Sequence, residues 1–311
     1  MEQAERLWPG PIALRRRPST NGEVAPRSAP PAHFRLSVVM AARDEAKTVH
    51  TAATNVLELR TSFELELVAV DDGSVDGTGE ILDRLVDPRL VVLHNHSPRG
   101  KGFSLLRAAE VATGTHLLVF DADLEYSADD IPSLVEPILD GTACTVYGSR
   151  VPGNHTAFGS FRYTMGSKLT TVAANVLFDA WVADMHTCLK LVPLPLFRQL
   201  SLHERGFGLD TEITAELLRR GVHPFEVPCS YRARSLADGK KLTARDGLAC
   251  LAILLRIRLS GHGGDRDAPG GTPPACREPA AAGEVPAVQD LPAALARPPD
   301  GRGRARAGTV T

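Results

Sequence analysis

Three carboxylates alternate with apolar residues at Asp121, Asp123 and Glu125, directly after the apolar run 117–120. In an extended segment, side chains two positions apart point the same way, so these like charges repel one another. A hard cation relieves such repulsion, and Mg²⁺ or Mn²⁺ is usually held by one or two carboxylates together with substrate phosphates. The pattern therefore predicts a divalent-metal site at these three residues. The alternative is a solvated acidic turn before a helix.

Acidic residues also follow two earlier apolar runs. Asp71 and Asp72 come directly after the run 65–70, and Glu45 comes shortly after the small residue Ala41. A small residue lets a ligand approach the backbone closely, and the carboxylates add hydrogen-bond acceptors. We therefore expect the acidic groups after these runs to lie on one rim with the alternating carboxylates.

Lys101 lies between Gly100 and Gly102, just before a segment with helical spacing. A lysine beside the free backbone N–H groups of a helix start suits a bound phosphate. The segment is not a P-loop, because the chain has no GxxxxGK[ST] there. A generic glycine-rich turn is the alternative.

From residue 36 onward, short β-branched runs alternate with longer segments of helical spacing, which indicates an α/β protein with a parallel sheet covered by helices. Strands are expected at 36–42, 65–70, 90–94, 116–120 and 142–147. Helices are expected between them at 45–59, 76–85, 101–113 and 127–139. The later part of the chain predicts helices at 161–178, 209–220 and 242–259, and a strand at 222–227. Because ligands bind at the carboxyl ends of strands in open α/β sheets, the acidic residues are expected on one rim.

The 311 residues include 35 Lys and Arg against 37 Asp and Glu, which excludes a strongly basic nucleic-acid-binding protein. Residues 1–33 and 261–311 hold 14 of the 23 prolines, and we expect both segments to be disordered tails. One domain is expected at 34–260. Its first half, 34–149, carries a charge of −10, and its second half, 150–260, carries +6.

The five cysteines show no CxxC or metal-ligand spacing, which favours a reduced, cytoplasmic setting. The longest apolar run, near 247–259, contains Arg256 and Arg258 and is shorter than the ~20 residues of a membrane span. A peripheral contact at the inner face of the membrane stays open as an alternative.

Taken together, these motifs resemble the family 2 glycosyltransferases of the GT-A fold, most closely the branch of dolichol-phosphate mannose and polyprenyl-phosphate hexose synthases. The matching stretches run in family order at 38–45, 70–78, 99–102, 121–123, 148–150 and 207–212. The resemblance implies a Rossmann-like, mostly parallel open sheet with helices on both faces. It also implies a Mg²⁺ or Mn²⁺ cofactor and a UDP- or GDP-hexose donor.

The resemblance assigns several residues of the first half to the donor nucleotide. Ala41, Glu45 and Asp71 match positions that hold the base and ribose in such enzymes. Lys101 and Gly102 match positions along the nucleotide pocket.

The resemblance also assigns the metal ligands. Asp121 and Asp123 match the DxD-type element, in which the second Asp typically binds the metal that bridges the diphosphate, and Glu125 stands where relatives place a third ligand, often Gln. Two stretches depart from the family pattern. The first motif has Arg-Asp-Glu at 43–45, without the usual aromatic residue and Asn, and 184–190 has Cys-Leu in place of Gly-Phe.

The basic half of the chain offers cations to an acceptor. Arg150 and Arg162 are expected to bind an acceptor phosphate, and Lys240 to close over the pyrophosphate of the donor. A phosphate monoester is already largely ionised at pH 7, because its second pKa is ~6, so its attack on the sugar needs no strong base.

The leading hypothesis is a metal-dependent inverting enzyme that moves a hexose from a UDP- or GDP-sugar to a polyprenyl phosphate, with Asp123, Arg150 and Asp184 as catalytic residues. The nearest alternative has the same donor but a polysaccharide or small-molecule hydroxyl as acceptor, which needs a carboxylate base. Asp184 is the preferred base, ahead of Asp210 and Glu212. A third hypothesis is a non-catalytic nucleotide-sugar-binding protein on the same fold.

Overall fold

The computed structural model describes residues 33–150, 155–157, 161–234 and 244–260, with the backbone alone at 162, 163 and 244–246. The predicted tails, 1–33 and 261–311, fall outside the described residues apart from His33. The predicted domain boundaries therefore stay a prediction.

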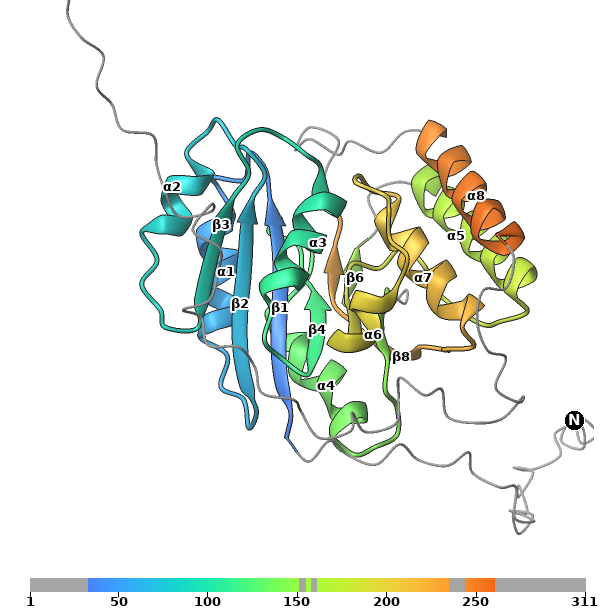
Figure 1. Ribbon diagram of the computed structural model, residues 1–311, viewed down its shortest axis with the longest axis horizontal. Helices are drawn as coiled ribbons and strands as arrows, with labels where there is room; N and C mark the ends of the chain where they lie inside the picture. Colours follow the sequence, from blue (N-terminus) through green and yellow to red (C-terminus); the bar gives the residue numbers. More distant parts are fainter. Residues whose placement is uncertain (1–32, 151–154, 158–160, 235–243, 261–311) are drawn as a thin grey trace, which may run out of the picture. The chain divides into compact units, whose positions relative to one another are not determined.

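The described strands are β1 (Arg35–Ala42), β2 (Glu64–Asp71), β3 (Leu90–His94), β4 (His116–Val119), β5 (Val146–Ser149), β6 (Thr156–Ala157), β7 (Lys190–Pro193), β8 (Phe225–Pro228) and β9 (Tyr231–Arg232). Seven of them form one sheet in the order β3-β2-β1-β4-β7-β5-β8 (Figure 1). Within this sheet, β7 runs antiparallel to β4 and β5, whereas the other neighbours are parallel. The remaining two, β6 and β9, pair with each other. The predicted mostly parallel α/β sheet is thus confirmed.

The described helices are α1 (Val49–Leu57), α2 (Thr78–Asp83), α3 (Lys101–Val111), the short 3₁₀ helix η1 (Ala128–Asp130), α4 (Ile131–Leu139), α5 (Phe161–Phe178), α6 (Leu194–Gln199), α7 (Leu209–Arg219) and α8 (Ala244–Leu259). The chain winds outward from β1 to β3 and then returns to β4. Right-handed crossovers therefore place α3 on the face opposite α1, and Figure 1 shows α3 in front of the sheet and α1 behind it.

The return of the chain at β4 creates the place for a site. β1 has β2 on one side and β4 on the other, so the connections leave the carboxyl ends of β1 and β4 in opposite directions. The crevice at such a reversal is where open α/β sheets bind ligands. Both strands are buried on both faces, as their nearly continuous apolar sequences require.

The predicted helix at 45–59 begins only at Val49. The backbone N–H groups of Glu45 and Ala46 donate to the side chains of Thr78 and Asp76, at 2.8 and 2.9 Å, rather than entering a helix. The loop after β1 is thereby tied to the loop after β2, which fixes both strand ends relative to each other.

Four elements of the second half were not predicted, namely the strands β6, β7 and β9 and the helix α6. β7 and α6 follow each other directly at 190–199, in a stretch that contains two prolines. Nearby, α5, α7 and α8 pack around a separate buried cluster of Ala174, Met185, Ala215, Ile253, Leu254 and Ile257.

Candidate active site

Asp123 lies in the turn that follows β4, where the chain leaves the buried strand. Its Oδ1 accepts a hydrogen bond of 3.0 Å from the backbone N–H of Glu125, and Leu124 between them has a left-handed φ of 60°. Burial, followed by repulsion from Asp121 and Glu125, raises the pKa of Asp123 to about 7. A cation that binds beside Asp123 would stabilise the ionised form of this carboxyl group.

The two flanking carboxylates already have protein partners. Asp121 Oδ1 lies 2.7 Å from Lys101 Nζ. Glu125 accepts hydrogen bonds from the hydroxyl of Tyr231 at 2.8 Å and from the backbone N–H of Arg234 at 2.7 Å. Neither carboxylate can turn fully towards a metal without weakening these contacts.

Within the described ranges, no group of three or more His, Cys, Asp or Glu side chains is arranged to hold a metal ion. The three predicted ligands therefore do not form a ready-made cage. The hard oxygen donors of Asp123 do fit Mg²⁺ or Mn²⁺, which commonly take one or two carboxylates and fill the other positions with water and substrate phosphates. The residues present thus suit a metal that arrives with a diphosphate.

Arg234 connects the ends of two strands, although the sequence analysis did not assign it to the site. Its guanidinium donates to both carboxylate oxygens of Glu45, at 3.0 and 2.7 Å, and its Nε donates to the backbone oxygen of Asp123 at 3.0 Å. Such two-pronged pairing fixes orientation as well as distance. Glu45 lies 189 positions earlier in the chain, so no local sequence pattern relates the two residues.

Beside the turn at Asp123, two lysines alternate with two aspartates. Lys101 Nζ lies 2.7 Å from Asp121 and 3.8 Å from Asp210, and Lys190 Nζ lies 3.6 Å from the other oxygen of Asp210. Burial lowers the pKa of Lys190, whereas at Lys101 the attraction of Asp121 outweighs burial and raises the pKa. Asp210 Oδ1 is buried without a hydrogen-bond partner within the described part of the chain. The sequence analysis included Lys190 only as the end of the family segment 184–190, because a lysine in a buried strand has no distinctive spacing that would place it beside Asp210.

The paired aspartates at the end of β2 have different partners. Asp72 accepts backbone N–H groups from Arg99 and Gly100, at 2.9 and 2.8 Å, and so holds the loop that leads into α3. Asp71 accepts the backbone N–H of Ser74 at 3.1 Å. The assignment of Asp71 to the nucleotide stays a proposal.

Ala41 and Gly102 were also predicted near the nucleotide. Ala41 is half-buried, and the next residue, Ala42, pairs in register with Asp71. A Cβ atom at Gly102 would lie 2.2 Å from the backbone oxygen of Glu204. Gly102 therefore allows the loop before α7 to press against the start of α3, which carries Lys101.

Arg150 and Asp184 form a largely buried two-pronged ion pair, with N···O distances of 2.6 and 2.7 Å. Although burial opposes ionisation, Arg150 outweighs it and lowers the pKa of Asp184. Asp184 is thus an ionised partner of Arg150 in this arrangement. Glu212 is similarly engaged, since it accepts a hydrogen bond of 2.8 Å from Arg256 on α8.

The two remaining predicted residues cannot be placed in the site. Arg162 belongs to α5, of which only the backbone is described at that position, and Lys240 lies outside the described residues. Among the helices that are described, none has the length and apolar character needed to cross a bilayer.

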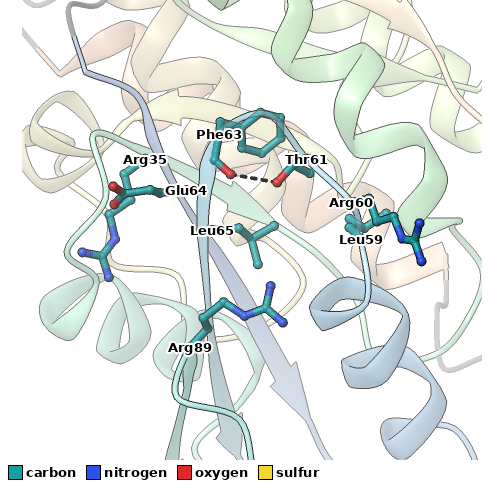
Figure 2. A pocket seen from close by; sticks show the side chains of 8 residues that line it. All are labelled: Arg35, Leu59, Arg60, Thr61, Phe63, Glu64, Leu65 and Arg89. Carbon is teal, nitrogen blue, oxygen red and sulfur yellow. Dashed lines mark hydrogen bonds between the residues drawn. The ribbon is translucent and has the colours of Figure 1, made fainter.

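A separate hollow of ≈ 560 Å³ lies at the end of the sheet where β1, β2 and β3 begin (Figure 2). Its lining includes Arg35 and Glu64, at the starts of β1 and β2, and Arg89 just before β3. Ligands of open α/β sheets bind at the other ends of the strands. The turn at Asp123, rather than this hollow, is therefore our candidate active site.

Comparison with known proteins decides the family. Residues 37–200 match the family model of glycosyl transferase family 2. The chain belongs to this family. A glycosyltransferase AglD from Haloferax volcanii is 28% identical over 242 residues, which cover 75% of this chain but 38% of that protein. An undecaprenyl-phosphate mannosyltransferase from Micrococcus luteus is 30% identical over 196 residues, or 57% of this chain and 76% of that protein.

Solved structures show the same fold at low identity. Mannosyl-3-phosphoglycerate synthase from Rubrobacter xylanophilus aligns with a TM-score of 0.59 and 20% identity, covering 77% of this chain and 79% of that one. Glucosyl-3-phosphoglycerate synthase from Mycobacterium tuberculosis, in complex with Mn²⁺, UDP-glucose and phosphoglyceric acid, aligns with a TM-score of 0.56 and 19% identity, covering 78% and 85%. Together with the family match, these findings confirm the predicted GT-A fold and glycosyltransferase class.

Proposed function

We propose that this family 2 glycosyltransferase moves a hexose from a UDP- or GDP-sugar to a polyprenyl phosphate, with inversion at the anomeric carbon. The observation that carries the proposal is the position of Asp123 in the turn after β4, flanked by Asp121 and Glu125 at the crevice where the chain direction reverses between β1 and β4. Carboxylates crowded at this place suit a metal-bound nucleoside diphosphate, because the metal offsets their repulsion. The Micrococcus luteus relative, named for transfer to undecaprenyl phosphate, supports the acceptor class.

Asp123 would hold Mg²⁺ or Mn²⁺, which when bound neutralises the charge that develops on the departing diphosphate. The protein's own residues orient the donor around it. Arg234 fixes Glu45 and the backbone at Asp123 relative to each other, so the nucleotide end and the diphosphate end of the site keep a constant spacing. Lys101, held between Asp121 and Asp210, adds a cation beside the same turn.

Arg150 is the cation that we assign to the acceptor phosphate. Asp184 holds its guanidinium from one side, and the preorganised arginine loses little side-chain entropy when a phosphate binds. The phosphate monoester brings its own negative charge to the attack, so no residue of the chain has to remove a proton.

One observation favours a second candidate, transfer to a hydroxyl acceptor. Of the three carboxylates considered as a base, Asp184 and Glu212 each accept hydrogen bonds from an arginine. Asp210 lies 3.6 and 3.8 Å from two lysines, but its buried Oδ1 has no hydrogen-bond partner among the described residues. Asp210 is therefore the residue that would accept the hydroxyl proton in that reaction.

A partition assay separates the two candidates. The purified chain is incubated with Mn²⁺, radiolabelled UDP- or GDP-hexose and either polyprenyl phosphate or oligosaccharide acceptors, and the product is divided between organic solvent and water. Label in the organic phase, lost in an Arg150→Gln variant but kept in Asp210→Asn, supports the lipid phosphate acceptor. Label found only in water, and lost in Asp210→Asn, would replace it with the hydroxyl acceptor.

A further inference from the structure

His94 lies between two carboxylates at the end of β3, the first strand of the sheet. Its Nε2 lies 2.9 Å from Asp83 Oδ1 on α2, and its Nδ1 lies 3.4 Å from Asp71 Oδ2 at the end of β2. In the sheet, His94 is also the register partner of Asp71. Helix α2 packs beside both strands at this edge (Figure 1). Each nitrogen of the imidazole ring therefore faces a carboxylate oxygen.

The surroundings of Asp71 are built for this contact. A Cβ atom at Gly79, in the first turn of α2, would lie 3.0 Å from Asp71 Oδ2 and 3.2 Å from His94 Nδ1. The lack of a side chain at Gly79 thus leaves room for the ring and the carboxylate to meet. The other oxygen of Asp71 accepts the backbone N–H of Ser74 at 3.1 Å. Asp71 is 6% exposed, and both of its oxygens have a partner.

The charged groups around His94 come from three elements. Asp71 belongs to β2 and Asp83 to α2, and Arg107 on α3 donates to the backbone oxygen of His94 at 2.6 Å. Burial opposes the charged ring, but hydrogen bonds to Asp83 and then Asp71 outweigh burial and raise the pKa of His94. The imidazolium form therefore persists to a higher pH in the folded chain than in the unfolded chain.

The protonation state of His94 decides whether both contacts can be hydrogen bonds. An imidazolium ring carries a proton on each nitrogen, whereas a neutral ring carries one. After deprotonation, one of the two carboxylates must face a nitrogen lone pair, which repels it. The contact with Asp83 is the shorter of the two, so the remaining proton stays on Nε2 and the hydrogen bond to Asp71 is lost.

We propose that His94 is a positioning residue for the sugar-nucleotide donor, which holds Asp71 in its binding orientation when protonated and releases it when neutral. This deepens the proposed function, because it rests on the assignment of Asp71 to the donor nucleotide. Asp71 ends β2 on the rim of the sheet where Asp123 follows β4. A carboxylate that is already held loses little side-chain entropy when a nucleotide binds. Donor affinity should therefore fall as the pH rises through the pKa of His94.

Calorimetric titration of the full chain with UDP and GDP, in the presence of Mg²⁺, tests the proposal. Wild type and His94→Gln are compared at about pH 6 and about pH 8.5, on either side of the range in which histidine titrates. Glutamine keeps one donating group but has no titration of its own. The ratio of the wild-type to the variant Kd cancels the titration of groups that both proteins share, Asp123 among them. We expect this ratio to rise about three- to tenfold between the two pH values.

Asp83→Asn separates positioning of Asp71 from a merely structural tie between α2 and β3. The side chain of Asp83 is 57% exposed, so the variant is expected to fold, which circular dichroism checks. With an amide at position 83, the neutral ring can keep its proton on Nδ1 and donate to Asp71, while Nε2 accepts from the amide. The Kd ratio of this variant to His94→Gln should therefore be the same at both pH values. A structural tie would instead weaken nucleotide binding at both.

His50→Gln, at an exposed histidine on α1, is the matched control and should follow the wild-type pH profile. The proposal is overturned if His94→Gln also keeps the wild-type profile, or if Asp83→Asn weakens binding equally at both pH values. Hexose transfer by the wild-type chain, measured separately, would leave the proposed function standing in either case. A wild-type chain that binds neither nucleotide and transfers no hexose would overturn the proposed function and the role of His94 together.

Discussion

Arg234 donates hydrogen bonds of 3.0 and 2.7 Å to the two carboxylate oxygens of Glu45, and so ties the segment after β9 to the loop after β1. The same arginine contacts the backbone at Asp123. The side chain of Arg234 thus holds together two sides of the site, one from each half of the domain. Loss of Arg234 should loosen both sides.

A double-mutant cycle measures this link. Glu45→Gln and Arg234→Gln are each expected to destabilise the chain and weaken donor binding, and the double variant should be less destabilised than the sum, with a coupling of about 1–2 kcal/mol in urea unfolding. The exposed pair Asp87–Arg89, with N···O 2.8 Å, is the matched control and should couple by less than about 1 kcal/mol. Additive effects at Glu45 and Arg234 would show that the pair has no such role.

Removal of Asp123, the carboxylate that we propose as metal ligand, should affect the chemical step. We expect Asp123→Asn to lower kcat for sugar transfer at least ~100-fold, because the charge on the leaving diphosphate is no longer neutralised. EDTA should abolish wild-type transfer, and excess Mn²⁺ should restore it in the wild type but not in the variant. Glu136→Gln, at an exposed carboxylate on α4, should behave as wild type. Full activity of Asp123→Asn would exclude the metal role of this residue.

Most of the central sheet could be predicted because its strands are local patterns. β1 and β2 are mostly apolar runs, each interrupted once, by Ser37 and by Glu66, and parallel strands buried on both faces favour such runs. β7 could not be predicted in this way. It has only four residues, begins with the buried Lys190 and ends at Pro193, and forms because β4 and β5 offer hydrogen bonds on its two sides.

The same distinction holds for the site. Asp121 and Asp123 could be found because the strand delivers them together in one short segment. Arg234 reaches that segment from 111 positions away, and its contact depends on how the two halves of the domain pack. A sequence pattern identifies residues that are neighbours along the chain, whereas these partners are neighbours only in the folded domain.

His116 should make the fold sensitive to acid. It is buried at the start of β4, with 8% of its surface exposed, and burial lowers its pKa from 6.5 to about 4. Because the folded-state pKa lies below that of the unfolded chain, this residue contributes stability above pH 6.5 that is lost as the pH falls towards 4. We expect His116→Phe, which keeps an aromatic ring beside Phe34, to reduce the loss of unfolding free energy between pH 7 and 4.5 by about 2–3 kcal/mol. Parallel pH profiles for the two proteins in urea unfolding would contradict this expectation.

Gly102 should be intolerant of even a methyl group. A Cβ there would lie 2.2 Å from the backbone oxygen of Glu204, so Gly102→Ala must displace either the loop before α7 or the first turn of α3, which carries Lys101. We expect a loss of about 1–3 kcal/mol in urea unfolding and a higher KM for the sugar nucleotide. Gly166 is the matched control, because it lies inside α5 with nothing within 4 Å of an added Cβ. Gly166→Ala should stabilise the chain by about 0.5–1 kcal/mol. Equal stability of the two variants would mean that the loop before α7 moves without loss of unfolding free energy and that Gly102 does not position Lys101.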